Sequence, residues 1–259
     1  MNYSNNLYKS NNKEYVPGIK IQDFAPKGRV SRIKGKTTNR VHHLLSDLET
    51  NVFYLMDFEE KITDIKEHYP LLDLHEVVDD LSDIKLEKFK NKKTGEEYTF
   101  TTTFVITLKG NGEENYVALS VRNETELYRD LLLEKLEVER RYWGKKEIRW
   151  SIITNKDIPM TKVNNIKWLY LGDVDIKYED EAYIKEVIAN KITYNKCAMK
   201  EILDNVDREL SLSIGTALVM FKRMIISNEI IVDLYSPINI EISAEKFTVN
   251  YQGVRKNVL

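Results

Sequence analysis

The side chains that could hold a metal ion are carboxylates spread over several predicted elements. Glu49 and Glu59 lie on or beside one predicted helix, and Glu139 lies on another. Carboxylate oxygens are the ligands that Mg²⁺ prefers, and a bound Mg²⁺ can activate a water and polarise a phosphate. His42 and His43 are adjacent and point in different directions. Without a third ligand they predict a structural or phosphate-contacting role rather than a metal site.

Three runs of basic side chains could contact a phosphate backbone. The net charge is −2, so any contact with nucleic acid must come from such local clusters rather than from bulk charge. One run lies between Lys85 and Lys93 and another between Arg140 and Arg149. Each run alone is more often a solvated face. The strongest candidate DNA-binding run contains no acid and consists of Arg29, Arg32, Lys34, Lys36 and Arg40.

The composition predicts a soluble protein of one large or two ordinary domains, since the chain has 259 residues. Cys197 is the only cysteine, which excludes an intrachain disulfide and a cysteine-based zinc site and fits a reducing compartment. The polar start does not read as a signal peptide, and no apolar run reaches the roughly 20 residues of a membrane span. We expect no contact with a membrane and a cytoplasmic location.

The elements that would position these residues alternate between helix and strand. Ser46 and Glu49 fit a capping box, which starts a helix predicted over 47–60. A short helix is expected over 74–81, and a hairpin over 98–106 and 116–121, with a turn at Gly110-Asn111-Gly112. A long helix over 124–145 and a buried strand over 147–154 complete a mixed α/β core. Residues 62–70 predict only a short turn or strand, residues 14–40 an arm without long elements, and residues 1–13 a disordered tail.

The last third of the sequence predicts a second domain. Residues 172–181 are acidic and poor in apolar side chains, so the boundary is placed at 171/172. Helices are expected over 199–210 and 213–228, followed by strands over 230–234 and 238–242. Two helices followed by a strand pair are typical of a winged helix. Winged helices bind DNA or dock other proteins, and the near-neutral charge here makes docking at least as good an interpretation.

Collinear motifs over residues 14–171 resemble the TnsA family, the restriction-endonuclease-like subunit of heteromeric transposases. The segment RVHHLLSDLE (40–49) is similar to the block that carries the family's catalytic glutamate, and LEKLEVERRYW (133–143) is similar to its long-helix signature. Further similarity lies in EYVP (14–17), YPLL (69–72), TNK (154–156) and IKWLY (166–170). The resemblance implies a restriction-endonuclease-like mixed-sheet domain over 14–171. Residues 172–259 resemble the family only in plan, as a helical, winged-helix-like domain.

The resemblance assigns roles to individual residues. Glu49 takes the place of the catalytic and metal-binding glutamate, and the resemblance favours this role over the alternative that it is only the third residue of the capping box. Glu59 takes the place of a second acid, or it is an exposed residue at a helix end. Glu139 takes the place of a third acid, or it pairs on the surface with Arg140 or Lys135. The implied cofactor is Mg²⁺.

Two positions depart from the family pattern. Thr103 stands where the family has its metal-binding aspartate, and a neutral hydroxyl cannot supply the charge that holds Mg²⁺. Arg122 stands in place of the catalytic lysine, and its high pKa excludes proton chemistry near neutrality. Glu97 lies six residues before Thr103 on the same strand and would be about 20 Å away, so Glu124, beyond the partner strand, is a better replacement acid, although its spacing does not support it. Asp57 and Glu60, on the helix of Glu49, could also lean toward the site.

The sequence therefore predicts one of three functions. The first is a TnsA-like subunit that cuts the 5′ strand at transposon ends by metal-dependent hydrolysis, with an impaired site. The second is a non-catalytic assembly subunit that bridges the DNA ends, an integrase-like transposase and an AAA+ ATPase regulator, the last through the C-terminal domain. The third, remote alternative is an unrelated DNA-binding α/β protein.

Overall fold

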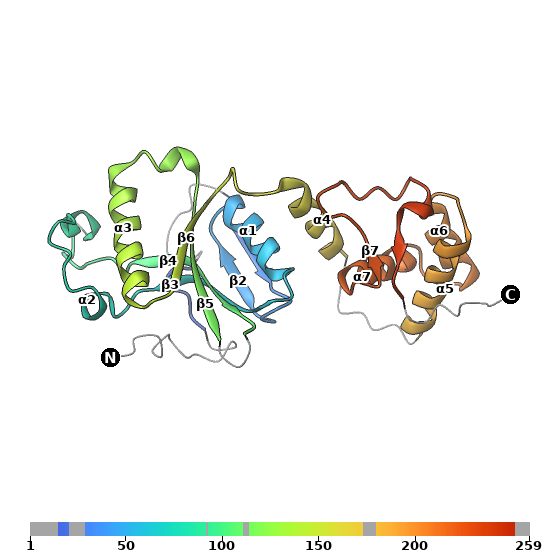
Figure 1. Cartoon of the computed structure of the whole chain (residues 1–259), viewed down its shortest axis with the longest axis horizontal. Coiled ribbons are helices and arrows are strands. Elements are labelled where there is room, and N and C mark those ends of the chain that lie inside the picture. Colours follow the sequence, from blue (N-terminus) through green and yellow to red (C-terminus); the bar gives the residue numbers. More distant parts are fainter. Residues whose placement is uncertain (1–14, 21–28, 92, 111–113, 173–179, 252–259) are drawn as a thin grey trace. The chain divides into compact units, whose positions relative to one another are not determined.

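The structure, a computed structural model, describes residues 15–20, 29–91, 93–110, 114–172 and 180–251 (Figure 1). The predicted tail over 1–13 lies outside these residues. The chain divides into two compact units, 1–158 and 159–259. The division falls before the expected boundary at 171 because the helix α4 (Met160–Tyr170) packs against α7 (Thr216–Ile226) of the second unit.

The first unit is built on a four-stranded mixed sheet in the order β3-β4-β5-β6. β3 (Ile62–Pro70), β4 (Thr101–Leu108) and β5 (Asn115–Arg122) are antiparallel, and β6 (Arg149–Thr154) lies parallel to β5. A parallel neighbour requires a crossover, which α3 (Asp130–Lys145) provides. This arrangement confirms the predicted mixed α/β class. The chain at 62–70 is a full strand rather than a short turn.

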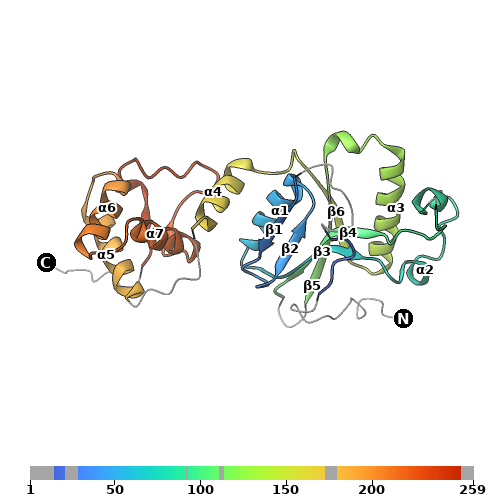
Figure 2. The same ribbon diagram turned by 180° about the vertical axis from the view of Figure 1, so that it is seen from behind.

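Helices cover both sides of the sheet. α1 (Asp47–Asp57) lies on one side and α3 on the other, as both views show (Figures 1 and 2). The core cluster on the α3 side contains Tyr142 and Trp143, packed against Val105 and Ala118 of the sheet. Short helical segments α2 (Leu74–Val77) and η3 (Leu86–Phe89) connect β3 to β4.

A second, two-stranded sheet precedes α1. β1 (Ser31–Lys34) and β2 (Val41–Leu44) form an antiparallel hairpin in a segment where only an irregular arm was expected. The Asp57 carboxylate, at the end of α1, accepts hydrogen bonds from the backbone N–H groups of Lys36 (3.0 Å) and Thr37 (2.9 Å) in the hairpin turn. The end of α1 therefore holds the hairpin turn in place.

The long helix begins later than predicted. Asn123 caps a short 3₁₀ turn, η4 (Glu124–Glu126), through its side chain and through the reciprocal contact of Glu126. This capping box starts a separate turn, which ends at Glu126, and α3 starts only at Asp130.

The second unit consists mainly of helices. α5 (Glu181–Tyr194), which the sequence did not predict, packs on α6 (Met199–Glu209) and α7. β7 (Ile230–Ile231) pairs with β8 (Thr248–Val249), so the strand predicted over 238–242 is wrong. The carbonyls of Ile240 and Ile242 instead accept hydrogen bonds from the first N–H groups of α6, which have no partner within the helix. The short helical turn η5 (Ala244–Lys246) precedes β8. Within the described residues, no helix is long and apolar enough to cross a membrane.

Candidate functional site

A cavity of about 720 Å³ opens in the first unit where the start of α1, the ends of β4 and β5, and the first turns of α3 meet. Its wall contains Glu49, Thr103, Arg122 and Lys135. The structure thus brings together three of the residues that the sequence predicted as one site. It also adds a lysine that the prediction considered only as a surface partner of Glu139.

Thr103 uses its hydroxyl oxygen as a double acceptor. The backbone N–H of Val121 donates to Oγ1 at 3.1 Å, and the Arg122 guanidinium donates to the same atom at 2.9 Å. A hydroxyl has two lone pairs, and these two bonds use both. Thr103 is therefore committed to protein donors and has no lone pair left for a metal ion.

Arg122 ties Thr103 to a buried acid. Nη1 donates to Thr103 and to the carbonyl of Val121 at 2.6 Å, and Nη2 lies 3.5 Å from Oε1 of Glu139. Glu139 is fully buried and also accepts a hydrogen bond from the Ser120 hydroxyl. The guanidinium thus brings a positive charge to the buried carboxylate. The alternative of a surface pair between Glu139 and Arg140 is wrong, because Arg140 pairs with Glu137.

Glu49 lines the same cavity, and its carboxylate is fixed at the start of α1. The backbone N–H of Leu45 donates to Oε2 at 2.7 Å, and Nε2 of His68 lies 3.4 Å from the same oxygen. The Ser46 hydroxyl accepts from the N–H of Glu49 at 3.1 Å, so the predicted cap forms. The Glu49 carboxylate, however, contacts Leu45 rather than the N–H of Ser46. The carboxylate of Glu49 therefore lines the cavity, while its backbone N–H is capped by the Ser46 hydroxyl.

Glu59 lies away from the cavity. It is exposed and follows the last turn of α1. A helix rises about 1.5 Å per residue, which separates its backbone from Glu49 by about 15 Å. The structure does not bring Glu59 to the cavity that Glu49 lines, which speaks against the prediction that the two residues share a metal ion.

The other acids considered as replacements have partners elsewhere. Asp57 binds the hairpin turn, Glu97 contacts His75 at 3.2 Å, and Glu124 pairs with Lys156 at 2.6 Å. None of these acids, nor Glu60, belongs to the cavity wall.

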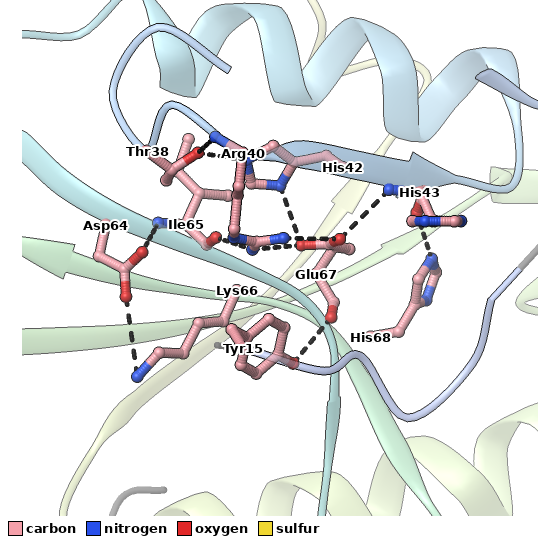
Figure 3. Close-up of polar contacts among 10 residues, drawn as sticks. All are labelled: Tyr15, Thr38, Arg40, His42, His43, Asp64, Ile65, Lys66, Glu67 and His68. Carbon is pink, nitrogen blue, oxygen red and sulfur yellow. Dashed lines mark hydrogen bonds and ion pairs between the residues drawn. The ribbon is translucent and has the colours of Figure 1, made fainter. Parts of the chain in front are cut away.

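A buried polar network lies below the hairpin and fixes two of the residues predicted to bind DNA (Figure 3). Arg40 forms a two-pronged ion pair with Glu67 of β3, with Nη1 at 3.0 Å from Oε1. Nδ1 of His42 lies 2.9 Å from Oε2 of Glu67, and its Nε2 lies 2.7 Å from the hydroxyl of Thr38. The phenolic O–H of Tyr15 donates to the backbone carbonyl of Glu67 at 2.9 Å.

This network corrects the interpretation of Arg40 and His42. The side chain of His42 has no exposed surface, that of Arg40 is 10% exposed, and both are engaged with Glu67. Burial raises the pKa of Glu67, but hydrogen bonds from His42 and Arg40 outweigh that effect and hold the pKa at about 2. Arg40 and His42 are therefore structural residues: they supply the charge and the hydrogen bonds that a buried Glu67 carboxylate requires.

His43 and His68 connect the network to the cavity. The N–H of His43 donates to Glu67 at 3.2 Å, and its carbonyl lies 3.1 Å from Nε2 of His68, which reaches Glu49. As expected, His43 points away from His42, and burial lowers its pKa. His68 has a backbone φ of +47°, an uncommon conformation for a residue with a side chain. Sequence reasoning missed His68, whose only signal is its place one residue after Glu67.

The remaining predicted DNA-binding residues lie on the surface. Arg32 and Lys34 alternate with half-buried residues along β1 and are exposed on the same face, as the two-residue period of a strand requires. Lys36 is exposed in the turn, and Arg29 lies 3.9 Å from Asp47 with its side chain 80% exposed. These four residues stay candidates for DNA contact.

The other two basic runs contain several ion pairs with acids. Lys88 lies 2.8 Å from Glu134. Arg141 pairs with Asp83, Lys145 with Asp79, and Lys146 with Asp73, each within 2.7 Å. The positive charge in these runs is largely compensated, which fits a solvated face better than a phosphate-binding one.

The residues present do not fit a Mg²⁺ ion. Thr103 has no lone pair to offer, and Glu139 is held by Arg122 and Ser120. The carboxylates in the cavity wall are those of Glu49 and Glu126, and Glu126 is engaged by Arg129 and by the N–H of Asn123. Within the described residues, no group of three or more His, Cys, Asp or Glu side chains could hold a metal. Mg²⁺ demands octahedral oxygen coordination with charged ligands. A guanidinium at the centre of such a site opposes it.

The mixed sheet, with acids and cations gathered at the end of its central hairpin and a small helical domain following, defines an endonuclease-like protein with two domains. The model of the TnsA-like endonuclease N terminal matches residues 59–155, and that of the TnsA endonuclease C terminal matches residues 157–234. The transposon Tn7 transposition protein TnsA of Escherichia coli is 39% identical over 160 residues, which cover 61% of this chain and 56% of that protein. The chain belongs to the TnsA family.

Proposed function

We propose that this chain is a subunit of a heteromeric DNA transposase that serves assembly on the transposon ends and does not cut their 5′ strand. The observation that carries the proposal is the contact of Arg122 with Thr103. Where the family has an aspartate and a lysine, this chain has a hydroxyl whose lone pairs are occupied and a guanidinium that donates to it at 2.9 Å. The site has kept a positive charge and lost a ligand.

The proposed partners follow from the family. An integrase-like transposase would cut and join the 3′ strands, and an AAA+ ATPase regulator would dock on the second unit, in which α5, α6, α7 and the β7–β8 pair follow the order of a winged helix. The exposed face of β1, with Arg32 and Lys34, would contact the DNA ends. Without 5′ cutting, each joined element stays tethered to its donor, so the products would be cointegrates.

The competing function is 5′ cleavage by this chain. It is favoured by the retention of Glu49, whose carboxylate is fixed in the cavity wall. Under this alternative Glu49 would bind the metal ion, and an acid not yet identified would replace the aspartate.

The two functions are separated by a nicking assay with the purified chain, its partner transposase, Mg²⁺ or Mn²⁺, and end-labelled transposon DNA. We expect no 5′ nicks from the unaltered chain and Mg²⁺-dependent nicks from the double variant Thr103→Asp, Arg122→Lys. In that variant Glu49→Ala should abolish nicking, and Glu59→Ala, a matched control outside the cavity, should not. Nicks made by the unaltered chain and lost on Glu49→Ala would refute the proposal.

A further inference from the structure

Lys135 lies in the wall of the cavity without a protein partner. It is part of the second turn of α3, is half-buried, and faces the same space as Glu49 and Arg122. Within the described residues it takes part in no hydrogen bond and no ion pair. Most other cations near the site are engaged, since Arg122 contacts Glu139 and Arg129 lies 3.7 Å from Glu126.

We propose that the cavity binds one phosphodiester of the DNA backbone without a metal ion, through Lys135 and Arg122. This inference rests on the proposed function and adds the ligand that the altered site would take. Nonbridging phosphate oxygens carry the negative charge that a metal ion balances in a nuclease. Two side-chain cations in the same cavity can take over that charge balance.

Arg122 has the donors for such a ligand. A guanidinium carries five N–H groups, and its contacts with Thr103, Val121 and Glu139 use three of them. Two N–H groups therefore have no protein acceptor among the described residues. The side chain is 14% exposed, so these donors are held in place and still reachable from the cavity.

Within the described residues, none of the carboxylates in or beside the cavity wall forms an ion pair with Lys135. Glu126, which also lines the wall, lies 3.7 Å from Arg129 and accepts a hydrogen bond from the N–H of Asn123. Oε2 of Glu49 is occupied by the N–H of Leu45 and faces His68. Glu139 lies buried behind Arg122. Burial lowers the pKa of Lys135, although Glu139 and Glu49 act in the opposite direction. A cation that burial disfavours gains more from an incoming anion than a solvated surface lysine does.

The test measures binding of the full chain to a transposon-end duplex by fluorescence anisotropy in EDTA, which excludes any divalent ion. We expect Lys135→Gln to weaken binding about tenfold at low salt, as the loss of a charged hydrogen bond implies. The slope of log K against log salt should fall by about 1. Lys135→Arg should retain most of the affinity. Lys145→Gln, on the same helix but paired with Asp79 at 2.6 Å, should change little.

A second measurement locates the phosphate. Single methylphosphonates are placed along the duplex, and each neutral linkage is tested against the unaltered chain and Lys135→Gln. One position should weaken the unaltered chain and leave the variant unaffected, since the contact is already lost. The inference would be overturned if the unaltered chain and the variants Lys135→Gln, Lys135→Arg and Lys145→Gln bound the duplex equally well. It would also be overturned if each methylphosphonate weakened the unaltered chain and Lys135→Gln by the same factor.

The failure of this inference and that of the proposed function are distinguishable. Parallel reactions with Mg²⁺ report 5′ nicks, which would refute the assembly function whatever the binding result in EDTA. Conversely, absent nicks together with an unchanged affinity of Lys135→Gln would leave the assembly function standing and remove the phosphate site. Thermal unfolding of Lys135→Gln checks its fold, which should be intact because the substitution removes a half-buried charge.

Discussion

At the scale of residues, the altered site shows how a change in one side chain alters its neighbour's chemistry. Thr103 is not merely an uncharged replacement, because its hydroxyl accepts from both Val121 and Arg122. Arginine supplies donors in a fixed planar fork, whereas lysine is a mobile point charge. Thr103 and Arg122 therefore form one local structure, so the two proposed departures from the family pattern are coupled.

Glu67 carries a prediction about stability. Glu67→Gln would leave the Arg40 charge buried without its counter-charge, so we expect a loss of about 3–5 kcal/mol in the free energy of unfolding. Urea denaturation at pH 7 followed by circular dichroism measures it. Glu59→Gln, on an exposed residue, is the control and should change little.

The same carboxylate predicts a dependence on pH. The pKa of Glu67 is about 2 in the folded chain against an ordinary value of 4.5. The ionised form thus stabilises the fold above about pH 4.5, and this contribution is lost as the pH falls from 4.5 toward 2. The difference in unfolding free energy between the unaltered chain and Glu67→Gln should shrink over that window. A constant difference would show that Glu67 is not the group responsible.

The structural roles of Arg40 and His42 could not be predicted from the sequence. Their basic character in a run without acids predicted contact with phosphate. Their burial depends on a carboxylate of β3, 27 residues after Arg40 and 25 after His42, that no local pattern points to. Lys135 was not predicted as a site residue for a related reason. Its helical spacing from Glu139 is that of an ordinary surface ion pair.

At the scale of elements, strong local sequence signals predicted helices and strands correctly, whereas weak signals did not. The cap at Ser46, the β-rich hairpin and the apolar spacing of α3 each predicted an element that is present. The hairpin of β1 and β2 was not predicted, because two strands of four residues give too short an alternation. The segment 238–242 has the composition of a strand but caps α6, a use of its backbone that tertiary contacts determine.

The attachment of the hairpin to α1 yields a prediction for this scale. Asp57→Ala removes the acceptor of two backbone N–H groups, at Lys36 and Thr37, each bond to a charged group contributing about 1.5–3 kcal/mol. We expect faster hydrogen exchange at these two amides and over β1 and β2, with little change in β4 and β5. Exchange measured by mass spectrometry or NMR tests this. Uniformly faster exchange across the sheet would indicate global destabilisation instead.

At the scale of the whole molecule, the chain consists of two units with separate cores. The units 1–158 and 159–259 each contain their own packed elements, and the two matched family models meet between residues 155 and 157. The sequence indicated two domains but placed the boundary at the acidic segment, since a composition shift is a visible signal. The helix α4 belongs by its packing to the second unit, which composition does not reveal.

The division predicts that each unit folds alone. Fragments 1–158 and 159–259, expressed separately, should each give a cooperative thermal transition. The first should keep the metal-free affinity for transposon-end DNA that the cavity is proposed to supply. Circular dichroism and anisotropy measure the two properties. A molten first fragment would show that α4 or later residues are needed for its core.

Under the proposed assembly function, the contact between Thr103 and Arg122 also constrains how 5′ cutting could arise in this chain. An aspartate restored at position 103 beside Arg122 would form a close ion pair with the guanidinium, which would occupy the new carboxylate. A lysine restored at position 122 would still face a hydroxyl. Neither single substitution provides a metal ligand that is free of the guanidinium and adjacent to a lysine. Under the proposal, 5′ cutting would therefore require both substitutions together, and neither change alone would be favoured by selection for cleavage.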